Sequence, residues 1–294
     1  MHRVSRRAAT FGLVSAFGLA GVFAASPAAA AEPLVQAAWL AAQLGNPHVV
    51  VLDIRPDAAY RAGHIPGAVS ADYQATGWTV PSPSGAAAAL PPVDRIAAVI
   101  GGLGVGDADT AVIVGDDFAG TARVYWTFKV LGHAQVALLD GGWKAWTGAV
   151  ETGPAVRKPA AFTAHYDPGV RALLPEVTAA VANGHAPLVD ARPLSSWSGA
   201  AQSPVVRAAG HIPGAVSIDQ NGTRTADGRL KSADALAALF APAGDKPAIV
   251  YCNTGHAAAA DWFVLSEVLH RPGTKLYDGS MSEWTAEPSR PVER

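Results

Sequence analysis

The chain has 294 residues, of which 50% are hydrophobic and 16% charged, and its formal net charge is −2. At roughly 100–200 residues per domain this length suits two domains, and the apolar content excludes a wholly disordered chain. No Lys/Arg-rich stripe follows the first seven residues, so we expect no nucleic-acid partner. Cys252 is the single cysteine, which excludes an intramolecular disulfide. The histidines show no metal-ligand spacing either, so we expect no metal site.

The N-terminal segment has the pattern of a secretory signal peptide. Arg3, Arg6 and Arg7 precede an uncharged, apolar run over residues 10–25, and small-residue cleavage sites follow. This run is shorter than the ~20 residues that a membrane-spanning helix needs, so cleavage is favoured over a membrane anchor. The arginine pair suggests the twin-arginine route. We therefore expect a periplasmic or secreted protein, with no stable membrane insertion after residues 1–31 are removed.

Four sequence blocks occur twice in the same order, which indicates a duplication. They are an Asp-x-Arg turn at 53–55 and 190–192, a Gly-His-Ile-Pro-Gly-Ala-Val segment at 63–69 and 210–216, an apolar run at 112–114 and 248–250, and an Asp-Gly pair before a tryptophan at 140–146 and 278–284. The second copy has an insertion around 199–207. After the signal peptide we predict a first domain at 33–150, a linker at 151–162 and a second domain at 163–294.

Each copy alternates short apolar strands with helices. This order predicts an α/β fold in which each domain has a mainly parallel sheet with helices on both faces. The expected strands are 49–53, 111–115 and 135–139 in the first copy, and 187–190, 247–251 and 274–277 in the second. The expected helices include 94–102 and 121–131 in the first copy, and 232–241 and 256–269 in the second.

Cys252 lies where an apolar strand runs into an alanine-rich helix. Ligands of parallel sheets bind beyond the carboxyl ends of the strands, and backbone N–H groups at a helix start can point toward an anion. Such a position favours the thiolate form of a cysteine. Gly255 would permit a turn with positive φ, and His256 would add a donor or a positive charge. The alternative is a buried, inert cysteine.

The repeated Asp-x-Arg turn, the Gly-His-Ile-Pro-Gly-Ala segments, the strand–Cys252–helix unit and the Asp-Gly-Gly-Trp motif together resemble the rhodanese family. The order of the two copies is similar to that of tandem thiosulfate and 3-mercaptopyruvate sulfurtransferases, over nearly all of residues 33–294. In such proteins only the C-terminal domain keeps the cysteine. The first-copy strand here ends in Asp116 and Asp117, and a carboxylate at Asp116 has no sulfur to transfer. We therefore expect a non-catalytic first domain.

The resemblance implies a sulfurtransferase. The Cys252 thiolate would take the outer sulfur of a small-molecule donor, become a persulfide and pass the sulfur to a thiol or cyanide acceptor. Loop amides would stabilise the persulfide, and no cofactor is implied. The expected substrate-binding residues are Arg192, Arg207 and the loop residues Asn253, Thr254, Gly255, His256, Ala257 and Ala258.

Several residues limit which reactions and substrates the cysteine loop is expected to serve. A phosphatase on this fold needs an arginine about six residues after the cysteine to grip phosphate, and Ala258 stands there. The loop has neither the basic residues typical of thiosulfate-specific relatives nor the Gly-Ser-Gly run of mercaptopyruvate-specific ones. Ser196 replaces an arginine that tandem members carry beside an aromatic residue. Arg192 and Arg207 remain as candidate anion contacts; the alternatives are a structural salt bridge for Arg192 and a solvated loop charge for Arg207.

Thiosulfate is the expected donor because it is an abundant extracytoplasmic sulfane-sulfur compound. 3-Mercaptopyruvate is the alternative donor, and the non-catalytic alternatives are a persulfide or polysulfide carrier and a structural binding module. His64 and His211 recur in both copies, so we expect them to tie the turn to a backbone carbonyl rather than to act in catalysis. No expectation about the oligomeric state follows from the sequence.

Overall fold

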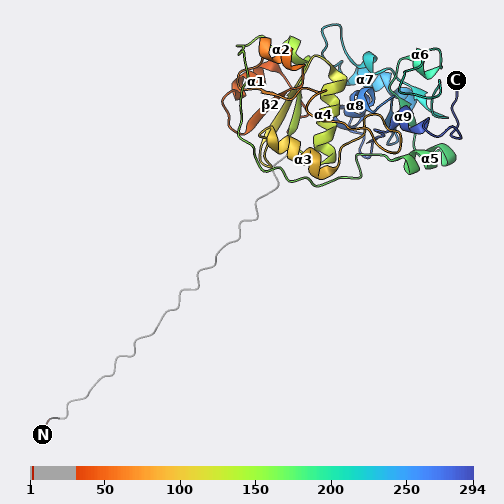
Figure 1. Cartoon of the computed structure of the whole chain (residues 1–294), viewed down its shortest axis with the longest axis horizontal. Coiled ribbons are helices and arrows are strands. Elements are labelled where there is room, and N and C mark those ends of the chain that lie inside the picture. The colour runs from red at the N-terminus through yellow and green to blue at the C-terminus, as the bar shows by residue number, and fades with distance from the viewer. Residues whose placement is uncertain (1, 3–30) are drawn as a thin grey trace.

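The computed structural model describes residue 2 and residues 31–294. The predicted signal peptide, residues 1–31, therefore lies almost entirely outside the described residues. Within the described part, no helix is long and apolar enough to cross a membrane. Two α/β domains lie side by side, and the chain ends at the far side of the second domain (Figure 1).

The first domain is built on a five-stranded parallel sheet with the order β1-β5-β4-β2-β3. Its strands are β1 (Leu34–Val35), β2 (Val49–Asp53), β3 (Val69–Ser70), β4 (Thr110–Val114) and β5 (Val136–Leu139). Its helices are α1 (Ala37–Gln43), α2 (Asp57–Ala62), α3 (Val93–Gly102) and α4 (Phe118–Val130), with a 3-10 turn η1 (Gly142–Ala145). The side chains of β4 are almost all buried, as in a central strand covered on both faces.

The second domain has a four-stranded parallel sheet with the order β7-β6-β8-β9. Its strands are β6 (Leu188–Asp190), β7 (Val216–Ser217), β8 (Ile249–Tyr251) and β9 (Lys275–Leu276). Its helices are α5 (Leu174–Asn183), α6 (Leu194–Trp197), α7 (Ala233–Leu239), α8 (His256–Phe263) and α9 (Ser280–Trp284), with the short turns η2 (Gln220–Thr223) and η3 (Ala241–Ala243) and a π-helical turn η4 (Val264–Val268). The α/β fold with two parallel sheets is confirmed.

The duplication extends to individual hydrogen bonds. Arg55 donates to both carboxylate oxygens of Asp53 and to the Gly63 carbonyl, and Arg192 makes the same bonds with Asp190 and Gly210 in the second copy. These buried pairs fix the turn after β2 and after β6.

The repeated histidines have the structural role expected of them. His64 Nδ1 lies 2.9 Å from the Tyr60 carbonyl oxygen, and His211 Nδ1 lies 2.8 Å from that of Trp197. Each imidazole also stacks on the aromatic ring of that same residue, with ring centroids 4.0 Å apart.

Two parts of the fold differ from the expectation. The strand β1 and the helix α1 were not predicted. The strand β1 has only two residues, too few to show a pattern, and it is defined by its pairing with β5. The predicted helix 256–269 is divided: α8 ends at Phe263, and the π-helical turn continues to Val268. The Leu269 N–H then bonds the Val264 carbonyl, five residues back, at 2.8 Å.

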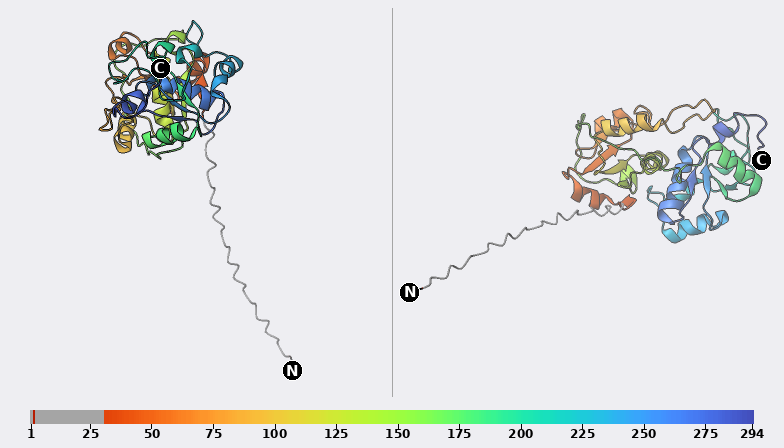
Figure 2. Two further views of the ribbon diagram at one scale, coloured as in Figure 1. Left: turned by 90° about the vertical axis from the view of Figure 1, so that its right-hand side faces the viewer. Right: turned by 90° about the horizontal axis from the view of Figure 1, so that it is seen from below.

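The two domains share one hydrophobic core across α4 and α8. Phe263 of α8 packs edge-on against Phe118 and Tyr125 of α4, with ring centroids 5.8 and 4.9 Å apart. Figures 1 and 2 show both helices between the two sheets. Since β4 leads into α4 and β8 leads into α8, this packing brings the carboxyl-end loops of two central strands to the boundary between the domains.

Candidate active site

Cys252 directly follows β8 and lies just ahead of α8. Its Sγ accepts hydrogen bonds from the backbone N–H groups of Gly255 (3.1 Å) and Thr254 (3.4 Å). Gly255 adopts φ +79, a conformation that side chains disfavour. The loop therefore curls around the sulfur with its amide donors pointing inward, a geometry that stabilises negative charge on the sulfur.

A second loop, at the start of α9, holds the cysteine loop in place. The Cys252 N–H donates to Ser280 Oγ at 3.1 Å, and the Met281 N–H donates to the Cys252 carbonyl at 3.0 Å. Ser280 Oγ in turn donates to the Tyr277 carbonyl, and its backbone has φ +52. Sequence reasoning recognised the Asp-Gly pair here but missed Ser280, because a serine after Asp-Gly carries no signal of its own.

Arg192 reaches the loop through one contact. Its guanidinium forms the buried pair with Asp190, and its Nη1 donates to Asn253 Oδ1 at 3.2 Å. Arg192 is only 3% exposed. The structure thus places Arg192 in the structural salt bridge that was its alternative reading, with Asn253 as its link to the cysteine loop.

Arg207 lies elsewhere. Its backbone N–H donates to Thr285 Oγ1 at 2.9 Å, and its Nη1 donates to the Ala286 carbonyl at 3.4 Å. Among the described residues, these hydrogen bonds tie Arg207 to the end of α9 and not to the cysteine loop. The expectation that the insertion brings this arginine to Cys252 finds no support in its contacts.

The remaining loop residues divide between the core and the surface. Ala258 is fully buried, and Ala257 packs partly against the shared core. Asn253, Thr254 and His256 are half-buried. The methyl side chains of the two alanines leave only their backbone N–H groups for a role in anion binding.

His256 connects the cysteine loop to the first domain. Its Nε2 lies 2.7 Å from Asp117 Oδ2, and its Nδ1 lies 3.0 Å from the Tyr73 hydroxyl. Burial raises the pKa of Tyr73 to about 12, so its hydroxyl keeps its proton at neutral pH. Burial alone would raise the pKa of Asp117, but the bonds from His256, Gly120 and Ala119 outweigh it and lower that pKa. No pattern in the sequence indicates that Tyr73 and Asp117 meet this loop.

A small cavity lies at this boundary. Its volume is about 220 Å³, and its lining includes His256 of the second domain. The first domain contributes Arg55, Asp72, Tyr73 and Asp117, among others. The cysteine itself is 2% exposed. The loop that carries Cys252 thus borders a cavity through His256, while the sulfur lies beneath the surface.

The first domain has Gly115 where the second has Cys252. The Ile54 N–H bonds the Val114 carbonyl just as the Ala191 N–H bonds that of Tyr251, which aligns the next residues, Gly115 and Cys252. This corrects the sequence alignment, which had placed Asp116 at the cysteine position. The sequence alignment of the two copies is wrong by one residue here, because runs of similar apolar residues do not define which residues are equivalent.

The same alignment accounts for the exchange of Trp143 for Met281. Trp143 N–H bonds the Gly115 carbonyl as Met281 N–H bonds that of Cys252. In the first domain the Trp143 ring covers the Arg55 guanidinium, 3.8 Å from its centroid. In the second domain Arg192 instead donates to Asn253, so no such aromatic cover is required.

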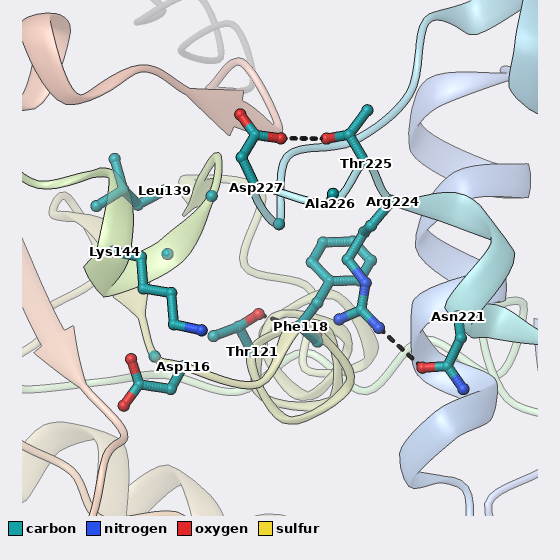
Figure 3. A pocket seen from close by; sticks show the side chains of 14 residues that line it. Asp116, Phe118, Thr121, Leu139, Lys144, Asn221, Arg224, Thr225, Ala226 and Asp227 are labelled. Atoms are coloured by element: carbon teal, nitrogen blue, oxygen red, sulfur yellow. Dashed lines mark hydrogen bonds between the residues drawn. The ribbon is translucent and has the colours of Figure 1, made fainter.

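A cavity of about 320 Å³ lies beside Gly115, at the carboxyl ends of β4 and β5. It is closed on the other side by the segment 221–228 of the second domain. Figure 3 shows Lys144 and Arg224 extending into it from the two domains, with Asp116 nearby. The first domain therefore keeps a polar hollow at the position of the cysteine loop, with Gly115 in place of the cysteine.

No group of three or more His, Cys, Asp or Glu side chains among residues 31–294 is arranged to hold a metal ion. The chemistry of the cysteine loop rests on a thiol, oriented amides and the side chains that surround them. Such an arrangement suits nucleophilic chemistry at sulfur.

Comparison with known proteins identifies the class. The model of the rhodanese-like domain matches residues 36–149 and again residues 174–287. A putative thiosulfate sulfurtransferase of Mycolicibacterium smegmatis is 33% identical over 277 residues, covering 88% of this chain and 97% of the relative. The sulfur carrier protein TtuD of Thermus thermophilus is 34% identical over 280 residues, covering 85% and 93%.

A solved structure agrees with these relatives. The 3-mercaptopyruvate sulfotransferase SseA of Escherichia coli superposes with a TM-score of 0.75 and 30% identity, covering 84% of this chain and 98% of that one. The chain belongs to the rhodanese family. It is a sulfurtransferase with two rhodanese-like domains.

Proposed function

We propose that the protein moves sulfane sulfur from thiosulfate to a thiol or cyanide acceptor through a persulfide on Cys252. The observation that carries this proposal is the pair of backbone N–H bonds from Thr254 and Gly255 to Sγ. Donors already aimed at the sulfur need no reorganisation when charge develops there. An inert buried thiol would have no need of them.

The reaction has two steps. In the first, the Cys252 thiolate attacks the outer sulfur of thiosulfate, a new S–S bond forms, and sulfite leaves with the electron pair of the broken bond. In the second, the acceptor attacks the outer sulfur of the persulfide, and the Cys252 thiolate leaves. With cyanide the product is thiocyanate, and with a thiolate it is a new persulfide. Neither step changes the total charge or consumes an oxidant.

The route to the sulfur is part of the proposal. Because Cys252 is 2% exposed, a donor reaches it only when a neighbouring side chain moves. We place this entry at the cavity of about 220 Å³ lined by Tyr73, Asp117 and His256. Side chains at such a domain boundary can shift without unfolding either sheet.

The choice of donor is tested by steady-state kinetics. Initial rates with thiosulfate and cyanide should give parallel double-reciprocal lines, as a ping-pong mechanism requires, and Cys252→Ser should abolish thiocyanate formation. A higher kcat/KM with 3-mercaptopyruvate than with thiosulfate would contradict the proposed donor. That donor is the second candidate because of the 30% identity to the Escherichia coli enzyme.

A carrier role is the other candidate, favoured by the similarity to the Thermus sulfur carrier protein. A carrier would load one sulfur on Cys252 and release it only to a partner protein. With small acceptors it would give a single stoichiometric burst followed by slow turnover. Sustained turnover with cyanide or a small thiol would exclude that role.

We also propose that the protein is exported, with residues 1–31 removed. The support is the arginine-containing start followed by the apolar run over 10–25. Expression of the full chain in a bacterium, followed by cell fractionation and N-terminal sequencing, tests this. A mature protein that starts near Glu32 in the extracytoplasmic fraction is expected, and an intact N-terminus in the cytoplasm would contradict it.

A further inference from the structure

Arg123 of α4 is a fully buried arginine without a full set of partners. It is 0% exposed, and its Nε and Nη1 have no hydrogen-bond partner among the described residues. Its Nη2 donates to the Ala88 carbonyl at 3.1 Å and lies 3.7 Å from Asp278 Oδ2. A guanidinium keeps its charge when buried, so leaving two of its donor atoms unpaired is costly for stability. Such a group calls for an explanation in function.

The free side of this guanidinium faces the cysteine loop. A Cβ built on Gly255 would lie 2.3 Å from Arg123 Nη1, so the two groups are packed directly against each other. Gly255 is also the residue whose N–H bonds Cys252 Sγ. A buried cation from the first domain thus packs against Gly255, the residue whose N–H donates to the second-domain cysteine.

Asp278 does not neutralise this charge. Its carboxylate already accepts two bonds from Arg171, at 2.8 and 2.9 Å, and one from the Leu90 N–H at 2.7 Å. Two guanidiniums therefore share one carboxylate, which leaves one excess positive charge beside the loop. The loop itself, from Cys252 to Ala258, contains no lysine or arginine.

Most of the other ionisable groups near the loop do not offset this excess. They include the paired Asp190 and Arg192, the Asp117–His256 contact, Tyr73, which keeps its proton, and Asp261, whose pKa burial raises well above its usual range. The Glu283 carboxylate lies against Gly279, the residue after Asp278. The Asp117 side chain is 58% exposed, so solvent screens its charge far more than that of a buried guanidinium.

We propose that Arg123 supplies the positive charge that holds an anionic sulfur species at Cys252 and thereby selects anionic donors. This inference rests on the proposed function of Cys252 and adds the class of donor and its positioning residue. Thiosulfate carries two negative charges, and the persulfide that it forms is again an anion. The N–H groups of Thr254 and Gly255, just ahead of α8, donate to the same sulfur.

Alkylation of the thiol tests this without requiring sulfur transfer. Iodoacetate and iodoacetamide react with the same thiolate and release iodide, but only iodoacetate is an anion. In Arg123→Met, a buried replacement of similar length, the ratio of the iodoacetate rate to the iodoacetamide rate should fall about tenfold, because the charge that attracts the anionic reagent is removed. Arg123→Lys should restore much of this ratio. Arg61→Met, an equal charge change at an exposed site, should leave the ratio unchanged.

A structural role predicts a different outcome. If Arg123 only supports the fold, Arg123→Met lowers the melting temperature while the ratio of the two alkylation rates stays as in the parent protein, and that result would overturn the inference. We expect the melting temperature to be unchanged or higher, because methionine leaves no unpaired donors in the core. If the parent protein forms no persulfide with thiosulfate, the proposed function fails, whatever the labelling ratios show.

Discussion

His256 Nε2 and Asp117 Oδ2 lie 2.7 Å apart and join the cysteine loop of the second domain to the first residue ahead of α4. Asp117 also caps α4, since its carboxylate accepts the N–H groups of Ala119 and Gly120. One carboxylate therefore fixes the start of a first-domain helix and one side of the cysteine loop. The first domain lacks a cysteine, yet it takes part in the site.

The first prediction concerns this carboxylate. Asp117→Ala should lower the free energy of unfolding by about 0.5–2 kcal/mol, because it removes the cap of α4. Asp117→Ser should keep most of that stability, since serine also caps helices, but it is too short to reach His256. Urea denaturation measures both. Asp116→Ala is the matched control and should cost no more than about 0.5 kcal/mol; an equal loss at both positions would contradict the capping role.

The second prediction concerns the glycine of the cysteine loop. Gly255→Ala places a methyl group 2.3 Å from Arg123 Nη1 and 2.8 Å from Asp278 Cα, so the loop must move. We expect persulfide formation with thiosulfate to slow by at least about tenfold, because the loop N–H groups lose their aim at the sulfur. Intermediate trapping by rapid quench measures the rate.

Gly214→Ala is the control for backbone strain alone. Gly214 has φ +76 in the same domain, and nothing lies within 4 Å of its added Cβ. Its substitution should cost about 1–2 kcal/mol of stability and leave the rate of persulfide formation unchanged. If both glycine variants slow the reaction equally, the effect of Gly255→Ala comes from general destabilisation and not from the loop.

The third prediction concerns pH. Asp261 in α8 is fully buried, and neither of its carboxylate oxygens has a hydrogen-bond partner among the described residues. Burial, with Asp219 and Asp190 nearby, raises its pKa well above the usual 3.8. The folded protein therefore binds this proton more tightly than the unfolded chain does, and the stability that it confers is lost as the pH rises from 3.8 through the raised pKa.

Asp261→Asn carries no charge at any pH and removes this dependence. Its melting temperature should exceed that of the parent protein by more at pH 8 than at pH 5, with about 2–4 °C expected for each kcal/mol gained. Thermal unfolding at the two pH values measures the difference. A constant difference, or one that shrinks toward pH 8, would show that the buried carboxyl does not titrate in this way.

Much of the fold could be predicted because the duplication reinforces weak signals. The apolar strands at β2, β4 and β8 are each bounded by turns, and the repeated blocks identify them as equivalent. Strand β1 could not be found, since two residues have no period and their place depends on pairing with β5. The one-residue error that assigned Asp116 to the position of Gly115 arose for a related reason: register in an apolar run is fixed by hydrogen bonds across the sheet.

Only those parts of the site that lie within one short segment around Cys252 could be predicted from the sequence. The position of Cys252 between a strand and a helix, and the need for positive φ at Gly255, follow from neighbouring residues. The contributions of Tyr73 and Arg123 come from the other domain, more than 100 residues away along the chain. They depend on the packing of α4 against α8, which no pattern within either helix encodes. Arg207 also depends on tertiary packing, since its hydrogen bonds join it to Thr285 and Ala286 at the end of α9.

The most direct test of the central claim is the intact mass of the purified protein after incubation with thiosulfate and removal of excess donor. Since Cys252 is the single cysteine, a gain of about 32 Da, lost on addition of cyanide and absent in Cys252→Ser, is the predicted result. An unchanged mass, or the same gain in Cys252→Ser, would show that this sulfur does not carry the transferred atom.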